Sequence, residues 1–295
     1  MINFNKFYKI FNIISFILML SSILLLSIKG LNFGVDFKGG TLIELRTTDN
    51  EINVTTLRKS FNKMNLGDVN VKKFGKDNDY LIKFEKKDIE PNTIEKIKTN
   101  LTNLIGDTFN FRRVENVGPK VSSELLKSGM IAILVSLAAM LFYIWIRFEW
   151  QFSLGAILAL FHDIIITLGF FSLFSLEINL SIVAAVLTIV GYSMNDTVVI
   201  FDRVRENLRK FSDIKIYELT NISINETLSR TIITSVTTLL ALLSIYIFGG
   251  EILKGFSLAM ILGVIFGTYS SIYIANPVLV KLRVSQKTII KEDID

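Results

Sequence analysis

Six apolar blocks constrain the fold of this chain more than any other feature of its sequence. A helix needs about 20 mostly apolar residues to cross a bilayer, and each block has about that length. Hydrophobic residues make up 51% of the 295 residues and the mean hydropathy is +0.49, too apolar for an ordinary soluble domain. The sequence therefore predicts an α-helical polytopic membrane protein with six transmembrane helices. The blocks are Tyr8–Ile28, Gly129–Ile146, Leu154–Phe174, Ile182–Phe201, Thr231–Phe248 and Phe256–Ala275.

Basic residues beside these blocks predict the orientation of the chain. Nearly all of them fall in the short segments on one side, whereas the opposite short loops hold only Lys254. Because cytoplasmic loops are enriched in Lys and Arg, both termini are expected in the cytoplasm. The first block is interpreted as an anchor, since its apolar core is longer than that of a signal peptide. The basic residues on the cytoplasmic side are Lys6, Lys9, Arg147, Arg203, Arg205, Arg209, Lys210, Lys215, Lys281, Arg283, Lys287 and Lys291.

Charge and cysteine content exclude several function classes. The formal net charge of +5 comes mainly from residues beside apolar blocks, which indicates membrane topology rather than nucleic-acid binding. The chain has no cysteine, so disulfides and thiolate metal sites are excluded. The single histidine, His162, cannot form a zinc site alone. We expect no metal and no cofactor.

One long polar insert separates the first block from the second. Its pattern predicts the order βαββαβ, which is that of a ferredoxin-like split unit. No acid pair, nucleophile or glycine-rich phosphate loop stands out in it, so a docking or structural domain is favoured over an enzymatic one. The predicted elements are the strands Thr41–Thr48, Val69–Phe74, Tyr80–Glu85 and Phe109–Val114, the turn Gly75–Asp79, a helix over Val54–Leu66, and a second helix with Asn92, after Pro91, as its N-cap.

These features divide the chain into four segments. Residues 1–28 are the cytoplasmic N-terminus and first transmembrane helix, and residues 29–128 are an extracytoplasmic α+β domain. Residues 129–276 are a five-helix membrane bundle, and residues 277–295 are a cytoplasmic tail. The glycines of GVDFKGGT, at positions 34, 39 and 40, and the pair Gly118-Pro119 are interpreted as joints between the insert and the membrane helices.

The fourth block carries Asn195 and Asp196 inside its apolar run. A carboxylate within a span costs about 2.5–3.5 kcal/mol on insertion scales, so an intramembrane acid indicates function by default. Thr188, Tyr192 and Asn195 recur at intervals of four and three, which places them on one helical face with Asp196 at its edge. We expect that face to look into a helix bundle.

Further polar residues lie at compatible depths in the neighbouring spans. His162 and Asp163 lie in the third block, and Arg230 is expected to head the fifth. The hydroxyl residues Thr231, Thr234, Ser235 and Thr238 follow Arg230 on one face. Two interpretations remain open for them: they line a water file, or they bond only to helix carbonyls. For the whole set a proton or ion path is favoured.

Small residues form a ridge along the sixth block. Ala259, Gly263, Gly267 and Ser271 follow one another at every fourth position, a spacing that allows close contact with another helix. That contact is expected within the chain or with another membrane subunit. The pair Asn276-Pro277 is expected to end the span.

Several segments together resemble the SecD/SecF family of the resistance-nodulation-division superfamily. They are VDFKGGT after the first block, VGPKVSSEL before the second, FHD in the third, GYSMNDTVVIFDRVREN across the fourth and SRTIITSVTTLL at the start of the fifth. The resemblance covers nearly the whole chain. It implies six spans that form half of a pseudo-symmetric twelve-span unit in the bacterial inner membrane.

The same resemblance implies a function. The chain would assist protein export at the Sec translocon, with a SecD-like six-span subunit as partner, exported preproteins as cargo and the proton gradient as energy source. It would touch membrane lipid and no nucleic acid. Asp196 resembles the proton-coupling acid and Arg230 its basic counterpart, while Asn195, Asp163, His162, Thr234 and Thr238 complete the expected relay. The alternatives are a scaffold subunit without proton conduction and a proton-coupled efflux subunit; an intramembrane protease is disfavoured.

Overall fold

The structure is a computed structural model that describes residues 1–49, 52–73, 78–84, 92–211 and 214–289, without the side chains of residues 93, 251 and 252. Several predicted positions therefore lie outside the described residues: the strand ends at Phe74 and Glu85, the turn residues 75–77, Pro91 and Lys291. The chain divides into two compact units. The first comprises Met1–Asn32, Ala132–Leu176 and Ser181–Asp295; the second comprises Phe33–Ile131 and Glu177–Leu180.

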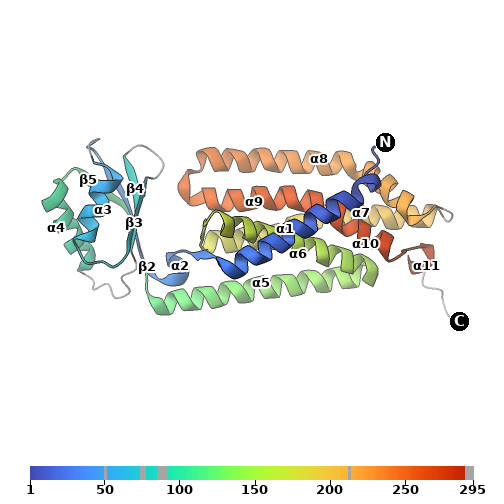
Figure 1. Cartoon of the computed structure of the whole chain (residues 1–295), viewed down its shortest axis with the longest axis horizontal. Coiled ribbons are helices and arrows are strands. Elements are labelled where there is room, and N and C mark those ends of the chain that lie inside the picture. The colour runs from blue at the N-terminus through green and yellow to red at the C-terminus, as the bar shows by residue number, and fades with distance from the viewer. Residues whose placement is uncertain (50–51, 74–77, 85–91, 212–213, 290–295) are drawn as a thin grey trace. The chain divides into compact units, whose positions relative to one another are not determined.

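Long helices make up the first unit (Figure 1). Within the described residues, six helical segments are long and apolar enough to cross a membrane, which confirms the predicted six-helix membrane protein. The helices are η1 (Asn5–Phe7), α1 (Tyr8–Ile28), α5 (Pro119–Arg147, which begins in the second unit), α6 (Trp150–Leu173), α7 (Leu180–Lys210), α8 (Ile216–Phe248), α9 (Gly250–Ser270), the π-helical turn η2 (Ser271–Ala275), α10 (Asn276–Lys281) and α11 (Gln286–Ile289).

Helices α7 and α8 extend well beyond their predicted apolar limits. α7 continues past Phe201 to Lys210, and α8 begins at Ile216, so Arg230 lies inside α8 and does not head it. Polar contacts between the two extensions explain the difference: Arg203 forms an ion pair with Glu226 at 2.7 Å, and the Asn207 amide donates to the same carboxylate at 2.6 Å. Hydropathy reports only the membrane-embedded part of a helix.

The predicted end of the sixth span at Asn276-Pro277 is wrong. The helix changes to a π-helical turn over Ser271–Ala275 and continues as α10 to Lys281. Pro277 falls in the first turn of α10, directly after the π-helical turn, where a proline is tolerated. The Asn276 side chain donates to the Ser271 carbonyl at 2.7 Å, which satisfies a backbone acceptor in the turn.

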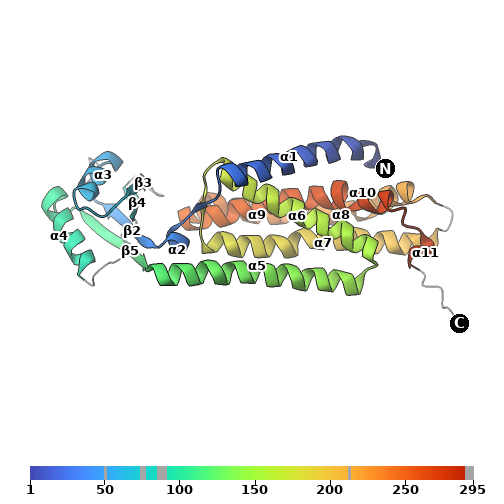
Figure 2. The ribbon, with the colours of Figure 1, turned by 60° about the horizontal axis from the view of Figure 1, so that its bottom comes forward.

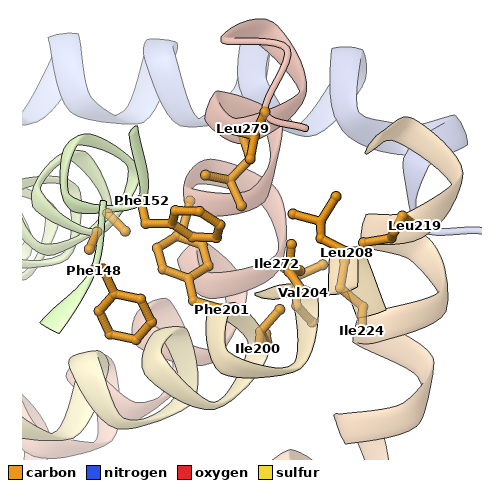
Figure 3. Close-up of a cluster of buried hydrophobic side chains, with 14 of the residues drawn as sticks. Phe148, Phe152, Ile200, Phe201, Val204, Leu208, Leu219, Ile224, Ile272 and Leu279 are labelled. Carbon is orange, nitrogen blue, oxygen red and sulfur yellow. The ribbon is translucent and has the colours of Figure 1, made fainter. Parts of the chain in front are cut away.

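An apolar core holds the first unit together where α6, α7, α8 and α10 meet (Figure 3). Phe152 and Phe201 are fully buried and meet edge to face with ring centroids 5.2 Å apart. Leu208, Leu219 and Leu279 extend the same cluster. Because the cluster packs against the C-terminal half of α7, it sets the rotation of the helix that carries Asp196.

The second unit, which we call the head, is a small α+β domain built around a four-stranded antiparallel sheet of order β3-β4-β2-β5 (Figure 2). Leu57 and Phe61 of α3 and Ile97 and Leu101 of α4 share one apolar core with the sheet. Its elements are β1 (Asn32–Phe33), α2 (Val35–Lys38), β2 (Gly40–Thr47), α3 (Val54–Asn62), β3 (Val69–Lys73), β4 (Asp79–Phe84), α4 (Thr93–Ile105), β5 (Phe109–Val117) and β6 (Glu177–Ile178).

The four strands and two helices of this sheet follow the predicted βαββαβ order. The strands pair so that β4 lies between β2 and β3, with Ile43 opposite Ile82 and Ile82 opposite Val71. All three side chains are buried against the helices. Asn92 does precede α4, but its side chain makes no capping hydrogen bond; Asn53 caps α3 by accepting from the Thr56 N–H at 3.0 Å.

Candidate functional site

Small residues let α9 and α7 approach closely at the level of the buried acids. A Cβ atom added at Gly263 would lie 2.3 Å from Ile189 Cγ1, and one at Gly267 would lie 3.0 Å from Ser193 Cα. Ser271, at the end of the same ridge, shares a hydrogen bond of 2.8 Å with Thr197. The small-residue ridge of the last span therefore packs inside the chain.

Asp163 lies in this contact region and is fully buried. One carboxylate oxygen, Oδ2, accepts hydrogen bonds from Ser193 of α7 at 2.5 Å and Ser270 of α9 at 2.7 Å. The other oxygen contacts His162 Nδ1 at 2.8 Å. A single carboxylate therefore joins three helices through short hydrogen bonds, which compensates the loss of water around it.

His162 continues this network toward α1. Its ring stacks on Tyr269, with centroids 5.9 Å apart, and the Tyr269 hydroxyl contacts Ser15 Oγ at 2.7 Å. The Tyr269 hydroxyl also donates to the Phe11 carbonyl at 2.8 Å. His162 Nε2 is buried and has no hydrogen-bond partner among the described residues, so the ring retains one unused polar atom.

Asp196 is buried one turn along α7 from Ser193, with 3% of its surface exposed. Thr268 of α9 donates to its Oδ2 at 3.2 Å, and Thr268 in turn shares a hydrogen bond of 2.7 Å with Ser235 of α8. Within the described part of the chain, Asp196 forms no ion pair. Its carboxylate is therefore less completely compensated than that of Asp163.

The structure does not bring Arg230 into an ion pair with Asp196. Arg230 lies on the exposed side of α8, and Asn195 lies on the exposed side of α7. Thr188 is exposed as well, so the predicted Thr188, Tyr192 and Asn195 face does not look into the bundle formed by this chain. The rotation of α7 follows its apolar stripe, in which Ile182, Ile189 and Ile200 are buried, and this leaves Asn195 outside.

Some hydroxyls of α8 bond only to helix carbonyls, and others do not. Thr234 Oγ1 donates to the carbonyls of Arg230 and Thr231 at 3.0 Å, as helix threonines commonly do. Thr238 is half-buried on the same helix. Ser235 instead bonds across to Thr268, and the buried Thr231 Oγ1 has no partner among the described residues. The side chain of Tyr192 links the two helices by donating to the Thr234 carbonyl at 3.3 Å.

Three residues of α7 and α9 that bind the two acids were not predicted from the sequence. Ser193, Thr268 and Ser270 supply hydrogen bonds to Asp163 or Asp196. In the sequence Thr268 and Ser270 appear only as small polar residues beside the ridge, which favours packing, and Ser193 is a lone serine of the fourth block. The clustering of three hydroxyls and a tyrosine in TYSS, residues 268–271, is the signal that points to hydrogen bonding. Among the described residues no three His, Asp or Glu side chains gather as they would around a metal ion.

Two family models match this chain. The one described as "Protein export membrane protein SecD/SecF, C-terminal" matches residues 96–285, and the one described as "SecD/SecF GG Motif" matches residues 24–51. The second range contains the joint segment VDFKGGT, and the first contains every predicted relay residue.

Curated relatives and solved structures agree with these matches. The protein translocase subunit SecF of Rickettsia bellii is 47% identical over 94% of this chain and 92% of its own length. That of Rickettsia rickettsii is 46% identical over 94% of this chain and 90% of its own length. The crystal structure of SecDF, a translocon-associated membrane protein from Thermus thermophilus, matches 95% of this chain with a TM-score of 0.85 and 34% identity.

A second SecDF structure, in a super-membrane-facing form, matches with a TM-score of 0.71 and 33% identity. This chain spans 38% of the length of either SecDF chain, so it corresponds to part of that larger protein. The chain has six apolar helices and the VDFKGGT segment, and SecF proteins match it over 94% of its length. The chain is a multi-pass membrane protein with a role in protein export, and it belongs to the SecF family of protein translocase subunits.

Proposed function

We propose that this chain couples proton flow through its membrane helices to protein export, and that Asp196 is the acid that takes up and releases the proton. The burial of Asp196 without an ion pair among the described residues carries the proposal. A charge held inside a span costs about 2.5–3.5 kcal/mol on insertion scales. In that position the ionised carboxylate has a strong tendency to bind a proton, and the neutral acid is tolerated; a proton carrier requires both properties.

Arg230 is proposed as the basic counterpart. It lies on α8, whose Ser235 reaches Asp196 through Thr268. A carboxylate that approaches a guanidinium tends to ionise, and one that moves away from both water and cation tends to protonate. Small rotations of α7 against α8 would alternate these surroundings. Each proton that crosses 100 mV supplies about 2.3 kcal/mol for such a movement.

The remaining predicted relay residues take supporting places in this proposal. Asn195 adjoins Asp196 on α7, and Thr234 and Thr238 follow Arg230 on α8 at intervals of one turn. His162 and Asp163 form a second polar centre that shares α7 and α9 with the first. We assign to this pair the task of holding the three helices together while protons pass at Asp196.

The head and the partners complete the proposal. The βαββαβ order and the strand order β3-β4-β2-β5 support a ferredoxin-like domain, and the distribution of basic residues supports an extracytoplasmic location with both termini in the cytoplasm. Because this chain spans 38% of a SecDF chain, we propose that a SecD-like six-span subunit supplies the other membrane half. Together they would act on exported preproteins at the Sec translocon of the bacterial inner membrane, with the proton gradient and no cofactor.

The test is gradient-dependent export in reconstituted vesicles that contain the SecD-like partner and the translocon. Asp196→Asn preserves size and one acceptor but removes titration, so the gradient-stimulated part of export should fall by roughly 10²-fold. Asp196→Glu keeps the acid and should retain part of the stimulation. Arg230→Met keeps the apolar stem without the charge and should lose stimulation while the complex still assembles.

A scaffold subunit that conducts no protons is the second candidate. It is favoured by one observation, the short hydrogen bonds around Asp163, which serve to hold helices. Normal gradient-stimulated export by Asp196→Asn, with normal assembly, would leave the scaffold as the function.

A further inference from the structure

The connection between α6 and α7 belongs structurally to the head. α6 ends at Leu173 and α7 begins at Leu180, and these two helices carry Asp163 and Asp196. Residues Glu177–Leu180 nevertheless cluster with the second compact unit, not with the helices they connect. The fold therefore anchors the start of the helix that carries Asp196 within the α+β domain.

Hydrogen bonds and an ion pair attach residues Glu177–Leu180 of this connection to the second unit. The Gly34 N–H donates to the Ile178 carbonyl at 2.8 Å, which extends the two-stranded pairing of β1 with β6. The Asp36 carboxylate accepts a hydrogen bond from the Leu180 N–H at 2.9 Å. On the sheet, Lys83 of β4 forms an ion pair with Glu177. The contacts of Gly34 and Asp36 come from the segment GVDFKGG, for which the proposed proton path provides no role.

The contact of Asp36 has a specific physical meaning. Leu180 is the first residue of α7, and the first N–H groups of a helix have no partner within the helix. They also lie at the positive end of the helix dipole, so a carboxylate placed there is favoured. A side chain from a distant part of the sequence therefore performs the capping that a neighbouring residue usually supplies.

The segment that presents Asp36 is itself held firmly. It forms the short helix α2 (Val35–Lys38), which ends at Gly39 with a φ of +79°, a conformation that favours glycine. A Cβ atom at Gly39 would lie 3.3 Å from the Val117 carbonyl oxygen and 3.4 Å from Ser122 Oγ. The glycine thus lets α2 pack against the junction of β5 and α5, which fixes the direction of Asp36.

We propose that Asp36 is a positioning residue that ties the start of α7 to the head, so that a displacement of α7 during proton passage is transmitted to the head. The inference rests on the proposed proton coupling and adds the joint through which the coupling acts. The Lys83–Glu177 ion pair and the β1–β6 pairing hold the same connection.

The first test compares three variants of the full chain, reconstituted with the SecD-like partner and the translocon. Asp36→Ala removes the acceptor and should abolish most of the gradient-stimulated export while gradient-independent export and assembly remain. Asp36→Asn retains an acceptor oxygen for the Leu180 N–H and should keep most of the stimulation. Asp68→Ala, at an exposed acid of the same domain, is the matched control and should match the unaltered chain.

The second test uses the ion pair, and it decides the matter if Asp36→Ala fails to assemble. Lys83→Glu and Glu177→Lys should each reduce gradient stimulation, and the double exchange should restore it. Unchanged stimulation in Asp36→Ala, or in both single charge reversals, overturns the inference. Asp196→Asn is measured in parallel. If Asp196→Asn alone behaves like the unaltered chain, the proposed function has failed. If Asp196→Asn loses gradient stimulation while Asp36→Ala keeps it in full, the proposed function stands and only the role of Asp36 is refuted.

Discussion

Two buried carboxylates in the membrane helices differ in how completely their surroundings compensate them. Asp163 accepts from Ser193 and Ser270 and contacts His162, whereas Asp196 accepts from Thr268. Hydrogen bonds to charged groups contribute about 1.5–3 kcal/mol each, so the two sites have different energetic roles. A group that binds several donors holds structure, and a group with few donors can change its protonation state at lower cost.

The expected result is a difference in stability between two matched variants. Asp163→Asn should lower the free energy of unfolding by roughly 1–3 kcal/mol, because the amide loses an acceptor in a fully buried site. Asp196→Asn should leave stability nearly unchanged or raise it, since it removes a poorly compensated charge. Thermal unfolding of the purified chain in mild detergent measures both. Equal destabilisation by the two changes would contradict this division of roles.

At the scale of elements, the contact of α9 with α7 decides where the hydroxyls lie. Gly263 and Gly267 let the helices approach until Ser193, Thr268 and Ser270 reach the acids. Beyond them the π-helical turn allows the last span to pass Pro277 and continue. The ridge and the turn belong to the same span, so close packing and an irregular helix occur together beside the polar centre.

Enlarging Gly263 should separate the two helices. Gly263→Leu places carbon atoms where Ile189 already lies, and overpacking of this kind costs about 1–3 kcal/mol. Gly191→Ala is the control on the exposed side of α7, where an added Cβ meets nothing within 4 Å. Unfolding of the isolated chain in detergent should shift for Gly263→Leu and stay unchanged for Gly191→Ala. A tolerated Gly263→Leu would show that the contact is loose.

For the whole molecule, the orientation of the head can be measured by chemical labelling. The chain has no cysteine, so single cysteines can be placed at will. Lys63 and Lys98 are exposed in the second unit, and cysteines there should react with an impermeant thiol reagent added outside intact cells. A cysteine at Lys287 should react only after the membrane is opened. Asp79 is unsuitable because it is buried beside Arg46. The reverse labelling pattern would show that the head lies in the cytoplasm and Lys287 outside it, contrary to the prediction.

The exposed polar face of the bundle leads to a prediction about assembly. Thr188, Asn195 and Arg230 are exposed on the membrane helices of this chain, where lipid offers no hydrogen bonds. A photo-crosslinker at Thr188 should therefore link the chain to a larger six-span protein, and the two should co-purify in mild detergent. A crosslinker at Ile13, an exposed apolar position of α1, is the comparison. Full activity of this chain as a monomer would exclude the need for a partner subunit.

The sequence by itself determined the membrane class, the number of spans and the order of elements in the head. These properties depend on local quantities: the length of an apolar run, the alternation of side chains and the composition of loops. The intramembrane acids Asp163 and Asp196 were also evident, since a charged residue in an apolar run is visible without a fold.

Only the tertiary structure decided which residues meet those acids. Ser193, Thr268 and Ser270 reach them because α7 and α9 approach at one rotation, and that rotation follows from the packing of the buried apolar side chains of both helices. The same packing turned Asn195 outward and left Arg230 without an ion pair to Asp196 among the described residues. The contact of Asp36 with Leu180 joins residues far apart in the chain, and no local pattern encodes such a pairing.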